Sequence, residues 1–357
     1  MVKRHDARGN LSLKIMYVDA GIDGHHLVYL KYLLKYATDG SFAVLPAIPH
    51  GMESCVHKAG SGSIRGFEEY GRWMKELRKI AAEEKPDIIH FLDGDTMMRH
   101  MGRGLGRFGD SRILITFHHF FGGKAREISM KSMLHYADVG VFHTESIQKK
   151  VRSFGCKNTK VVPYPCFLEM PPEKGRGYHN EPPVLLALGG TRRDKGLDIL
   201  LEALEKVHNS FELIIAGKPE DFDEAFIAGH IEKYSEKVRT ILRFLSDQEV
   251  EKFLSESDII VLPYRKEFDG ASGPMCEGIY LGKTIIGPDH GSLGKQLRES
   301  HAGYVFESEN SDKLAACIEY ALEHPCIYDE TACQVQQELR PELFTERYRQ
   351  IYNELLL

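Results

Sequence analysis

The amino-acid sequence predicts an α/β protein with two Rossmann-like, doubly wound domains that face a cleft. Three observations predict this fold class. Short apolar runs alternate with amphipathic stretches, a Pro- and Gly-rich break divides the alternation into two series, and the 357 residues exceed what one hydrophobic core usually serves. Open sheets of this kind bind ligands beyond the carboxyl ends of their strands, so the turns after the strands are the places to search for function.

The first half of the chain carries five apolar runs typical of buried parallel strands. Helical stretches such as 25–37 and 67–84 separate them, which is the βαβ pattern. We expect this half to form an N-terminal domain over residues 1–165. Its predicted strands are LKIMYVDAG (13–21), FAVLPAI (42–48), DIIHFL (87–92), ILITFH (113–118) and VGVFH (139–143).

The second half repeats the pattern after the segment 161–183, whose Pro, Gly and charged residues are typical of a linker. We expect a second domain over residues 166–340. The tail 341–357 is an amphipathic helix with no strand after it. The predicted strands of the second domain are VLLAL (184–188), FELIIAG (211–217), TILRFL (240–245), DIIVLP (258–263), KTIIG (283–287) and GYVF (303–306).

The composition is that of a soluble globular protein. The net charge is −6 with both signs mixed along the chain, which argues against a nucleic-acid binder driven by bulk charge. The seven cysteines are scattered and form no CxxC pair, so we expect free thiols in a reducing cytoplasm. The sequence shows neither an apolar signal-peptide core nor a run of about 20 apolar residues. We expect a cytoplasmic protein and leave peripheral contact with the inner face of a membrane open.

The turn after the run 184–188 combines features that suit a diphosphate. Gly189 and Gly190 let the backbone approach a ligand closely, and a helix predicted to begin near Asp194 turns its positive end toward it. The alternative is a tight turn with solvated basic residues. The turn matches neither the GxGxxG fingerprint nor a Walker A loop, which disfavours NAD and P-loop chemistry. Three side chains add positive charge: Arg192, Arg193 and Lys195.

These residues carry a resemblance to a known family. The segment 189–204, GGTRRDKGLDILLEAL, resembles the phosphate-binding turn of GT-B glycosyltransferases of family GT4, and 269–291 resembles the family's E-x7-E motif with the Gly-Lys strand after it. The stretch 246–264 resembles the helix and strand that precede that motif. TFHH (116–119) lies where these enzymes carry a His, and the tail resembles the C-terminal helix that crosses back to the N-domain. The resemblance therefore implies the GT-B fold.

The resemblance assigns roles around the second motif. Glu277 holds the position of the acid that binds the ribose hydroxyls, a task that suits a carboxylate because it accepts from two adjacent O–H groups. Ser272 is expected to cap the helix that begins there. Backbone N–H groups between the two acids would approach the phosphates, and they belong to Gly270, Ala271, Ser272 and Gly273.

The first acid of the motif is Asp269, where relatives usually carry Glu. Its implied partner is a hydroxyl of the donor sugar, and its shorter side chain leaves this contact open. Glu267 is a nearby substitute that is out of register.

The basic residues also depart from the commonest pattern of the family. Many relatives have Arg five positions before the Lys, where this sequence has Gly190, but a variant places Arg three positions before it. The resemblance therefore implies that Arg192 and Lys195 clamp the diphosphate, with Arg193 in reserve. Two cations there would stabilise charge that develops on the leaving diphosphate.

The N-terminal half is expected to bind the acceptor. The segment 19–30, DAGIDGHHLVYL, resembles the family's first loop near the donor phosphates, with Gly21 and Gly24 as the positions of close approach and His25 or His26 near the helix start. His118 ends a predicted strand and would orient the donor sugar, with His119 as the alternative. For each histidine, an ordinary loop or strand-end role is the competing interpretation.

Asp93-Gly94-Asp95 has the spacing of a metal-binding DxD pair. Such three-residue matches are common by chance, and the phosphate turn lies elsewhere in the sequence. An acceptor-loop role or helix capping is the preferred interpretation, and no metal site is predicted.

Together with these features, the resemblance implies a retaining, metal-independent hexosyltransferase. Its donor would be a UDP-, GDP- or ADP-sugar, its acceptor a glycan (as in polysaccharide biosynthesis), a lipid-linked molecule or a small molecule, and no cofactor or nucleic acid is expected. The departures at Asp269 and Gly190 keep two alternatives open, an inactive GT-B-like binding or scaffold subunit and a sugar-nucleotide epimerase.

Overall fold

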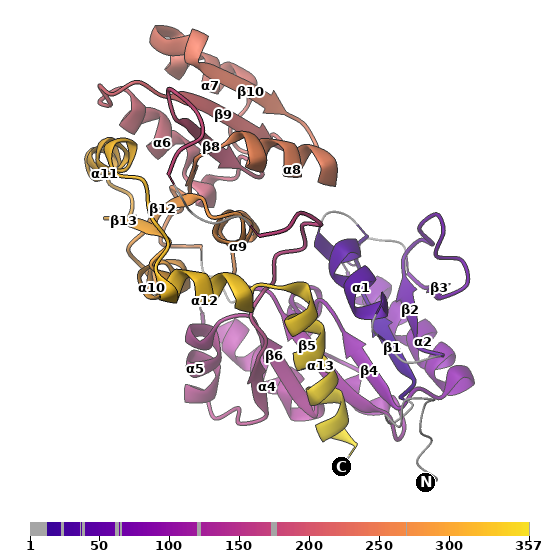
Figure 1. The fold of residues 1–357 in the computed structure, drawn as a ribbon. Coiled ribbons are helices and arrows are strands. Elements are labelled where there is room, and N and C mark those ends of the chain that lie inside the picture. Colours follow the sequence, from indigo (N-terminus) through magenta and orange to yellow (C-terminus); the bar gives the residue numbers. More distant parts are fainter. Residues whose placement is uncertain are drawn as a thin grey trace. The chain divides into compact units, whose positions relative to one another are not determined.

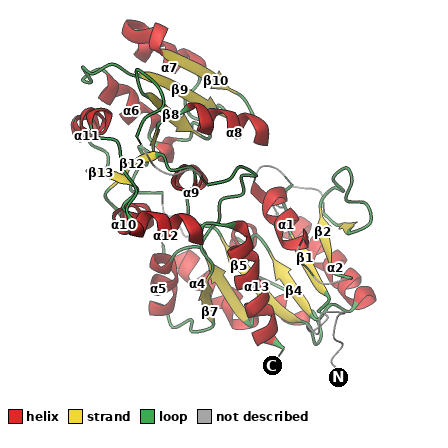
Figure 2. Ribbon diagram, viewed as in Figure 1, coloured by secondary structure: helices red, strands yellow, loops and turns green. Residues whose placement is uncertain are grey.

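The computed structural model describes residues 13–22, 25–35, 37, 40–60, 64, 66–119, 123–172, 177–268 and 270–356. The chain divides into two compact units (Figure 1). Unit 1 is Met1–Pro163 together with Pro341–Leu357, and unit 2 is Tyr164–Arg340. Helices and strands alternate within both units, as the α/β prediction requires (Figure 2).

Unit 1 contains a parallel sheet with seven strands among the described residues, in the order β3-β2-β1-β4-β5-β6-β7. Five of them confirm the predicted runs. The two edge strands were not predicted because their sequences, VHK and TKV, are mostly polar and form no apolar run. The strands are β1 (Ile15–Val18), β2 (Phe42–Leu45), β3 (Val56–Lys58), β4 (Ile88–Phe91), β5 (Arg112–Phe117), β6 (Val139–Phe142) and β7 (Thr159–Val161).

The helices of unit 1 cover both faces of this sheet. Apolar side chains of α2, α3, α4 and α5 form one core with alternate strand residues such as Met16, Val18 and Phe91. Helices α1 and α13 pack on the other face, through aromatic contacts such as Tyr17 with Tyr352. The helices are α1 (His25–Lys35), α2 (Phe67–Glu84), α3 (Gly94–Met98), α4 (Lys124–Tyr136), α5 (Glu145–Ser153) and α13 (Pro341–Leu355), with the 3₁₀ helix η1 (Leu105–Arg107).

A buried chain of hydrogen bonds connects α13 with α1 and with strands β4 and β5 of the unit 1 sheet. The Tyr348 hydroxyl lies 2.5 Å from that of Tyr29 and 2.8 Å from Thr116 Oγ1. His90 continues the chain, with Nε2 2.8 Å from Thr116 Oγ1 and Nδ1 2.7 Å from the Tyr352 hydroxyl. Burial lowers the pKa of His90 well below its ordinary value, so the imidazole stays neutral at physiological pH. Because an unpaired buried polar group is costly, these bonds fix the helix on the sheet.

Unit 2 contains a second parallel sheet, with six strands in the described part of the chain in the order β10-β9-β8-β11-β12-β13. All six correspond to predicted runs, which are long and apolar because these strands are covered on both faces. The strands are β8 (Val184–Leu188), β9 (Glu212–Gly217), β10 (Val238–Leu242), β11 (Ile259–Val261), β12 (Thr284–Pro288) and β13 (Gly303–Phe306).

Successive strand residues of unit 2 enter two different cores. Leu186 and Ile260 pack with α8, α9, α10 and α12, whereas Leu185 and Ile259 pack with α6, α7 and α11. This alternation shows that helices cover both faces. The helices are α6 (Leu197–Leu204), α7 (Glu224–Ile231), α8 (Asp247–Glu256), α9 (Gly273–Tyr280), α10 (Gly291–Ser300), α11 (Ser311–Glu323) and α12 (Glu330–Glu338), with the 3₁₀ helices η2 (Arg193–Lys195) and η3 (Glu232–Lys237).

Both sheets reverse their strand order at one place, between β1 and β4 in unit 1 and between β8 and β11 in unit 2. Ligands of open α/β sheets bind beyond the carboxyl ends of the strands at such a reversal. Within the described residues, no helix is long and apolar enough to cross a membrane. All seven cysteines are described, and none forms a disulfide.

Candidate functional site

In unit 2, the turn after β8 lies at the reversal of strand order and is shaped by glycines. Gly189 adopts a φ of +121°. At Gly217, which ends β9, a Cβ atom would lie 1.9 Å from the carbonyl oxygen of Gly189. Side chains at these positions are therefore excluded, and the backbone of the turn packs directly on the end of the neighbouring strand.

The helix after this turn begins later than predicted. Residues Arg193–Lys195 form the 3₁₀ helix η2, and α6 begins at Leu197 rather than near Asp194. Gly196 between them has a φ of +65°, and a Cβ there would lie 2.0 Å from the carbonyl oxygen of Pro263. The glycine therefore permits a sharp bend that lets the turn approach the end of β11. The apolar face of α6 is buried: Leu197, Leu200, Leu201 and Leu204.

Arg192 forms an ion pair with Asp194, two residues further along the chain. Its Nε and Nη2 donate to the two carboxylate oxygens of Asp194 at 3.0 Å and 2.9 Å. Burial opposes the guanidinium charge, but the bonds to Asp194 and the charge of Glu220 raise the pKa of Arg192 above its ordinary value. Of the predicted clamp, Arg192 is therefore already paired with Asp194, an acid of its own turn.

Gly190 and Arg193 complete the turn. A Cβ at Gly190 would lie 2.5 Å from Glu220 Oε2, so this carboxylate occupies the space beside the position where relatives carry Arg. Arg193 is exposed, and its backbone fixes the turn: its N–H donates to Asp221 Oδ2 at 2.7 Å, and its carbonyl accepts from Arg265 Nε at 3.0 Å.

Lys195 points back toward the glycines. Its Nζ lies 3.7 Å from the position that a Cβ on Gly189 would take, and it donates to the Tyr264 hydroxyl at 2.7 Å. The same nitrogen lies 4.3 Å from the centre of the Tyr264 ring and 5.3 Å from that of Phe268. An ammonium group is thus fixed beside the tight turn, where a phosphate could approach the backbone.

The second motif begins at the N-terminus of α9. Ser272 is the N-cap residue, and its buried hydroxyl accepts from the backbone N–H of Met275 at 3.4 Å, which confirms the predicted cap. The carbonyl of Gly270 accepts from Ser292 Oγ at 3.0 Å, which ties the segment before the cap to α10. Gly273 begins the helix and Ala271 is partly exposed. Asp269 lies outside the described residues.

Glu277 is partly buried on α9. Burial raises the pKa of its carboxyl group to about 7, while the charge of Lys195 lowers it and that of Asp247 raises it. The two motifs meet through the Tyr264 hydroxyl, which contacts both Lys195 Nζ and Ser272 Oγ. A carboxyl group that titrates near neutral pH is poised to gain a hydrogen-bonding ligand.

Tyr264 lies three residues after the end of β11 and was not among the predicted site residues. It is buried, and its hydroxyl contacts both Lys195 Nζ and, at 3.3 Å, Ser272 Oγ. An aromatic residue at a strand end usually belongs to the core, so its residue type gave no signal. The position of β11 beside β8 in the sheet would have indicated it.

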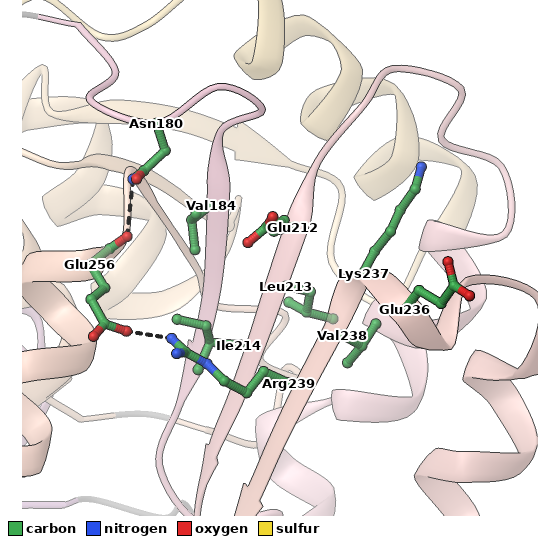
Figure 3. Close-up of a pocket in the computed structure, with 10 residues that line it drawn as sticks. All are labelled: Asn180, Val184, Glu212, Leu213, Ile214, Glu236, Lys237, Val238, Arg239 and Glu256. Atoms are coloured by element: carbon green, nitrogen blue, oxygen red, sulfur yellow. Dashed lines mark hydrogen bonds and ion pairs between the residues drawn. The ribbon is translucent and has the colours of Figure 1, made fainter.

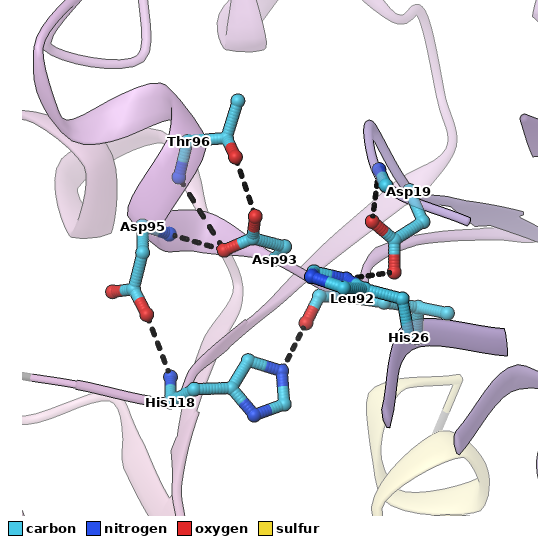
Figure 4. A network of polar contacts seen from close by, with 8 residues as sticks. Asp19, His26, Leu92, Asp93, Asp95, Thr96 and His118 are labelled. Atoms are coloured by element: carbon cyan, nitrogen blue, oxygen red, sulfur yellow. Dashed lines mark hydrogen bonds and ion pairs between the residues drawn. The ribbon is translucent and has the colours of Figure 1, made fainter. Parts of the chain in front are cut away.

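In unit 1, the corresponding turn after β1 carries a buried acid (Figure 4). Asp19 Oδ1 accepts from the backbone N–H of Gly21 at 2.9 Å, and Oδ2 lies 3.0 Å from His26 Nδ1. Burial raises the pKa of Asp19, and the charge of Asp93 adds to this effect. A Cβ at Gly21 would lie 3.0 Å from the His26 ring, so this glycine leaves room for it. Gly24 and the side chain of His25 lie outside the described residues.

Asp93 and Asp95 accept hydrogen bonds from different segments of the backbone. Asp93 caps α3 by accepting from the N–H groups of Asp95 and Thr96, which confirms the capping interpretation. Asp95 Oδ2 accepts from the N–H group of His118 at 3.1 Å (Figure 4). It also accepts from the N–H group of His119 at 3.0 Å. Burial and the charge of Asp93 raise the pKa of Asp95 well above its ordinary value.

Among the described residues, one group has the spacing of metal ligands, and it is not the DxD pair. It contains Asp19, His26 and Asp93, whose ligand atoms lie within 4.8 Å of one another. These residue types could hold a divalent cation.

His118 lies directly after β5, as the sequence predicted, and its ring is buried. Its Nε2 donates to the carbonyl oxygen of Leu92 at 2.8 Å, and Tyr29 packs against the ring edge-on with 5.3 Å between centroids. The ring orientation is therefore set by β4 and α1. Contact of His118 with a sugar stays a prediction.

A pocket of about 360 Å³ lies at the other end of the unit 2 sheet (Figure 3). It is lined by the first residues of β8, β9 and β10, including Val184, Glu212 and Val238. Because the strands are parallel, these amino ends are opposite to the turns that carry Lys195 and Glu277. This pocket is therefore separate from the candidate donor site.

Solved structures establish the fold class. Sucrose-phosphate synthase from Thermosynechococcus elongatus is 14% identical in sequence, has a TM-score of 0.75, and is matched over 96% of this chain and 99% of that one. HepE of Anabaena, solved in complex with UDP, is 12% identical with a TM-score of 0.72, over 96% of this chain and 100% of that one. The chain has the GT-B fold of glycosyltransferases.

Sequence comparison finds a family model and a relative that match part of the chain. Residues 173–338 match the family model of glycosyl transferases group 1. An uncharacterised glycosyltransferase of Methanocaldococcus jannaschii is 29% identical over 133 residues, which are 36% of this chain and 35% of that protein. The chain spans about a third of this relative's length. The segment that resembles the glycosyl transferases group 1 family is therefore most of unit 2.

Proposed function

We propose that this chain is a glycosyltransferase that moves a sugar from a nucleotide-diphosphate sugar to a hydroxyl group of an acceptor. The observation that carries the proposal is that Lys195 is linked through Tyr264 to Ser272, the N-cap of the helix that carries Glu277, where the strand order of the unit 2 sheet reverses. The cation and the helix N-terminus suit the diphosphate of such a donor, and the carboxylate suits its ribose hydroxyls.

Each part of the donor has a proposed partner. Lys195 contacts the diphosphate, together with backbone N–H groups of the segment 270–273, while Gly189 leaves room for the phosphates to approach the turn. Glu277 accepts from the ribose hydroxyls in its ionised form. Arg192 contacts the diphosphate as a pair with Asp194, and this pairing makes its contribution smaller than that of Lys195. The solved complex of HepE with UDP supports a nucleotide ligand for this fold.

Unit 1 is proposed to bind the acceptor. Its strand reversal carries the acids Asp19, Asp93 and Asp95. Carboxylates and imidazoles bind hydroxyl groups well, and an acceptor sugar presents several. A glycan, a lipid-linked molecule or a small molecule each fits this chemistry, and the lipid-linked case would bring the protein to a membrane surface.

The reaction is proposed to retain the anomeric configuration and to need no metal. In this scheme Lys195 and Arg192 stabilise the negative charge of the leaving nucleoside diphosphate, a task that a metal ion performs in other transferases. Transfer in the presence of EDTA would support the metal-free scheme. Loss of transfer that Mg²⁺ restores would contradict it and would direct attention to Asp19, His26 and Asp93.

A ligand screen tests the proposal without knowledge of the acceptor. Thermal shifts are measured with UDP, GDP and ADP and with the corresponding glucose and mannose nucleotides, because a ligand that binds the folded state raises the melting temperature. One nucleotide series is expected to stabilise the protein. Glu277→Ala should weaken its binding by ~1–3 kcal/mol, the cost of losing a charged hydrogen-bond partner.

The matched control is Glu205→Ala, which removes an exposed acid of the same unit and should leave the affinity unchanged. If no nucleotide binds the intact protein, the proposal fails. Binding without transfer across donor and acceptor panels would instead indicate an inactive binding protein, and conversion of the sugar nucleotide without acceptor would indicate an epimerase.

A further inference from the structure

We propose that Tyr264 is a positioning residue of the donor site, and that its hydroxyl holds Lys195 ready for the diphosphate and couples it to the N-terminus of α9. This role rests on the proposed function and extends it to a residue outside the two motifs. The juxtaposition that carries it is a single buried hydroxyl between Lys195 and Ser272.

The sheet topology places Tyr264 between the two turns. It follows β11, whose neighbours in the sheet are β8 on one side and β12 on the other. The turn after β8 carries Lys195, and the helix that precedes β12 begins after Ser272. Tyr264 is 2% exposed, so its ring and hydroxyl have little freedom to move.

The hydrogen-bond roles follow from the chemistry of the three groups. The ammonium group of Lys195 can only donate, so the Tyr264 oxygen accepts at 2.7 Å. The same hydroxyl lies 3.3 Å from Ser272 Oγ, which in turn accepts from the N–H of Met275 as the helix cap. One side chain thus links a cation of the first motif to the cap of the second.

This link prepares Lys195 for binding. A free lysine side chain loses about 2 kcal/mol of rotamer freedom when it is fixed, which weakens any phosphate contact it makes. Here Tyr264 holds the ammonium through its hydroxyl and through its ring, whose centre lies 4.3 Å from Nζ. Since Nζ has three hydrogens, two stay available for phosphate oxygens.

The competing interpretation is that Tyr264 only fills the core, since its ring packs with Phe268 and belongs to an apolar cluster of unit 2. Tyr264→Phe separates the two interpretations because it keeps the ring and removes only the hydroxyl. If Tyr264 only fills the core, Tyr264→Phe should not weaken binding of the diphosphate specifically.

The test compares a ligand that has phosphates with one that lacks them. Dissociation constants of Tyr264→Phe and the wild type are measured by calorimetry for UDP, GDP or ADP, whichever binds, and for the matching nucleoside. We expect affinity for the diphosphate to fall about three- to tenfold, as for the loss of one hydrogen bond in a charged site, and affinity for the nucleoside to stay unchanged.

A double-mutant cycle with Lys195→Ala provides a second readout that does not need nucleoside binding. Because the hydroxyl acts through Lys195, adding Tyr264→Phe to Lys195→Ala should cause no further loss of diphosphate affinity. Tyr328→Phe is the matched control, since it also removes a partly buried hydroxyl of unit 2, one that donates to the Lys283 carbonyl at 2.8 Å.

The outcomes of these experiments distinguish the proposed function from the proposed role of Tyr264. If no nucleotide binds the wild type, the proposed function is overturned and the role of Tyr264 with it. If nucleotides bind and Tyr264→Phe leaves the diphosphate affinity unchanged, or lowers it equally with and without Lys195, only the role of Tyr264 is overturned.

Discussion

The two units share one topology and differ in charge at the same place. Both sheets are parallel and reverse their strand order beside the first strand of the unit. In unit 1, the turns at this reversal carry Asp19, Asp93 and Asp95, whereas in unit 2 the turn after β8 carries Arg192, Arg193 and Lys195. The fold therefore provides the location of a site, and the residues placed there decide which ligand it takes.

The charges of the two units are also held differently. The acids of unit 1 mostly accept from main-chain N–H groups, as Asp95 does from His118 and His119. The cations of unit 2 contact side chains, as Lys195 does with Tyr264. Main-chain bonds fix the shape of the unit 1 turns, while side-chain bonds in unit 2 leave the cations able to exchange partners with an anion.

Removal of the central cation of unit 2 should have the largest effect on ligand binding. Lys195→Ala is expected to weaken binding of the nucleoside diphosphate by roughly 2–3 kcal/mol, because a charge-assisted contact to a phosphate is lost. Calorimetric titration measures it. Lys206→Ala removes an exposed lysine of the same unit that pairs with Asp312, and it should bind like the wild type. Equal effects of both changes would mean that only net charge matters.

The second largest expected effect is a pH dependence of nucleotide binding that arises from Glu277 of unit 2. Burial raises the pKa of Glu277 to about 7 in the free protein, and the ionised form is the one proposed to accept from ribose hydroxyls. Binding therefore favours deprotonation, so affinity should be constant at high pH and should fall as the pH drops through 7, approaching tenfold per pH unit.

Glu277→Gln provides the control, because it removes the titrating group and leaves the phosphates of the ligand to titrate alone. Dissociation constants measured between pH 5.5 and 8.5 should show a flatter profile for this variant. A profile as steep as that of the wild type would assign the pH dependence to another group.

In unit 1 the acid Asp19 should instead affect stability. Its pKa is raised in the folded protein, so its contribution to stability is present at low pH and is lost as the pH rises through the folded pKa. Asp19→Asn removes this cost, and we expect the free energy of unfolding at pH 7 to rise by on the order of 1 kcal/mol, with no gain at pH 3.

Thermal unfolding at the two pH values measures this difference. Asp110→Asn, at an exposed loop position of the same unit, should change stability little. A loss of stability at pH 7 in Asp19→Asn would show that its bonds to Gly21 and His26 outweigh the cost of burying its charge.

The smallest expected effect concerns the acid beside Gly190. The carboxylate of Glu220 lies where a side chain at position 190 would project, so it should repel a bound diphosphate. Because Glu220 is exposed and water screens its charge, Glu220→Gln should tighten diphosphate binding only about twofold. Titration at low ionic strength makes the change easiest to detect. Weaker binding would show that Glu220 supports the turn through Arg192.

Much of this architecture could be predicted from the sequence because buried parallel strands leave continuous apolar runs. All six strands of unit 2 were found in this way, while β3 and β7 are mostly polar and produce no such run. The cap at Ser272 was predictable because a serine before Gly-Pro at a helix start is a local signal. The start of α6 was misplaced because the bend at Gly196 depends on Pro263, a residue distant in sequence.

The site was less predictable than the fold, since partners of charged groups come from several turns. The sequence indicated Arg192 and Lys195 as equivalent clamps, but Arg192 pairs with Asp194 while Lys195 contacts Tyr264. Tyr264 itself has no local signal and becomes visible only when the strand order is known. Spacing in the sequence suggested a pair in Asp93 and Asp95, but these acids bind different backbone groups.

Hydrogen exchange with and without the nucleoside diphosphate that binds is the most direct test of the difference between the units. Backbone N–H groups of the segments 189–196 and 270–277 should exchange more slowly in the complex, because these turns are proposed to hold the diphosphate and the ribose. Binding of the nucleotide with no added protection in either segment would contradict the assignment of the donor site to unit 2.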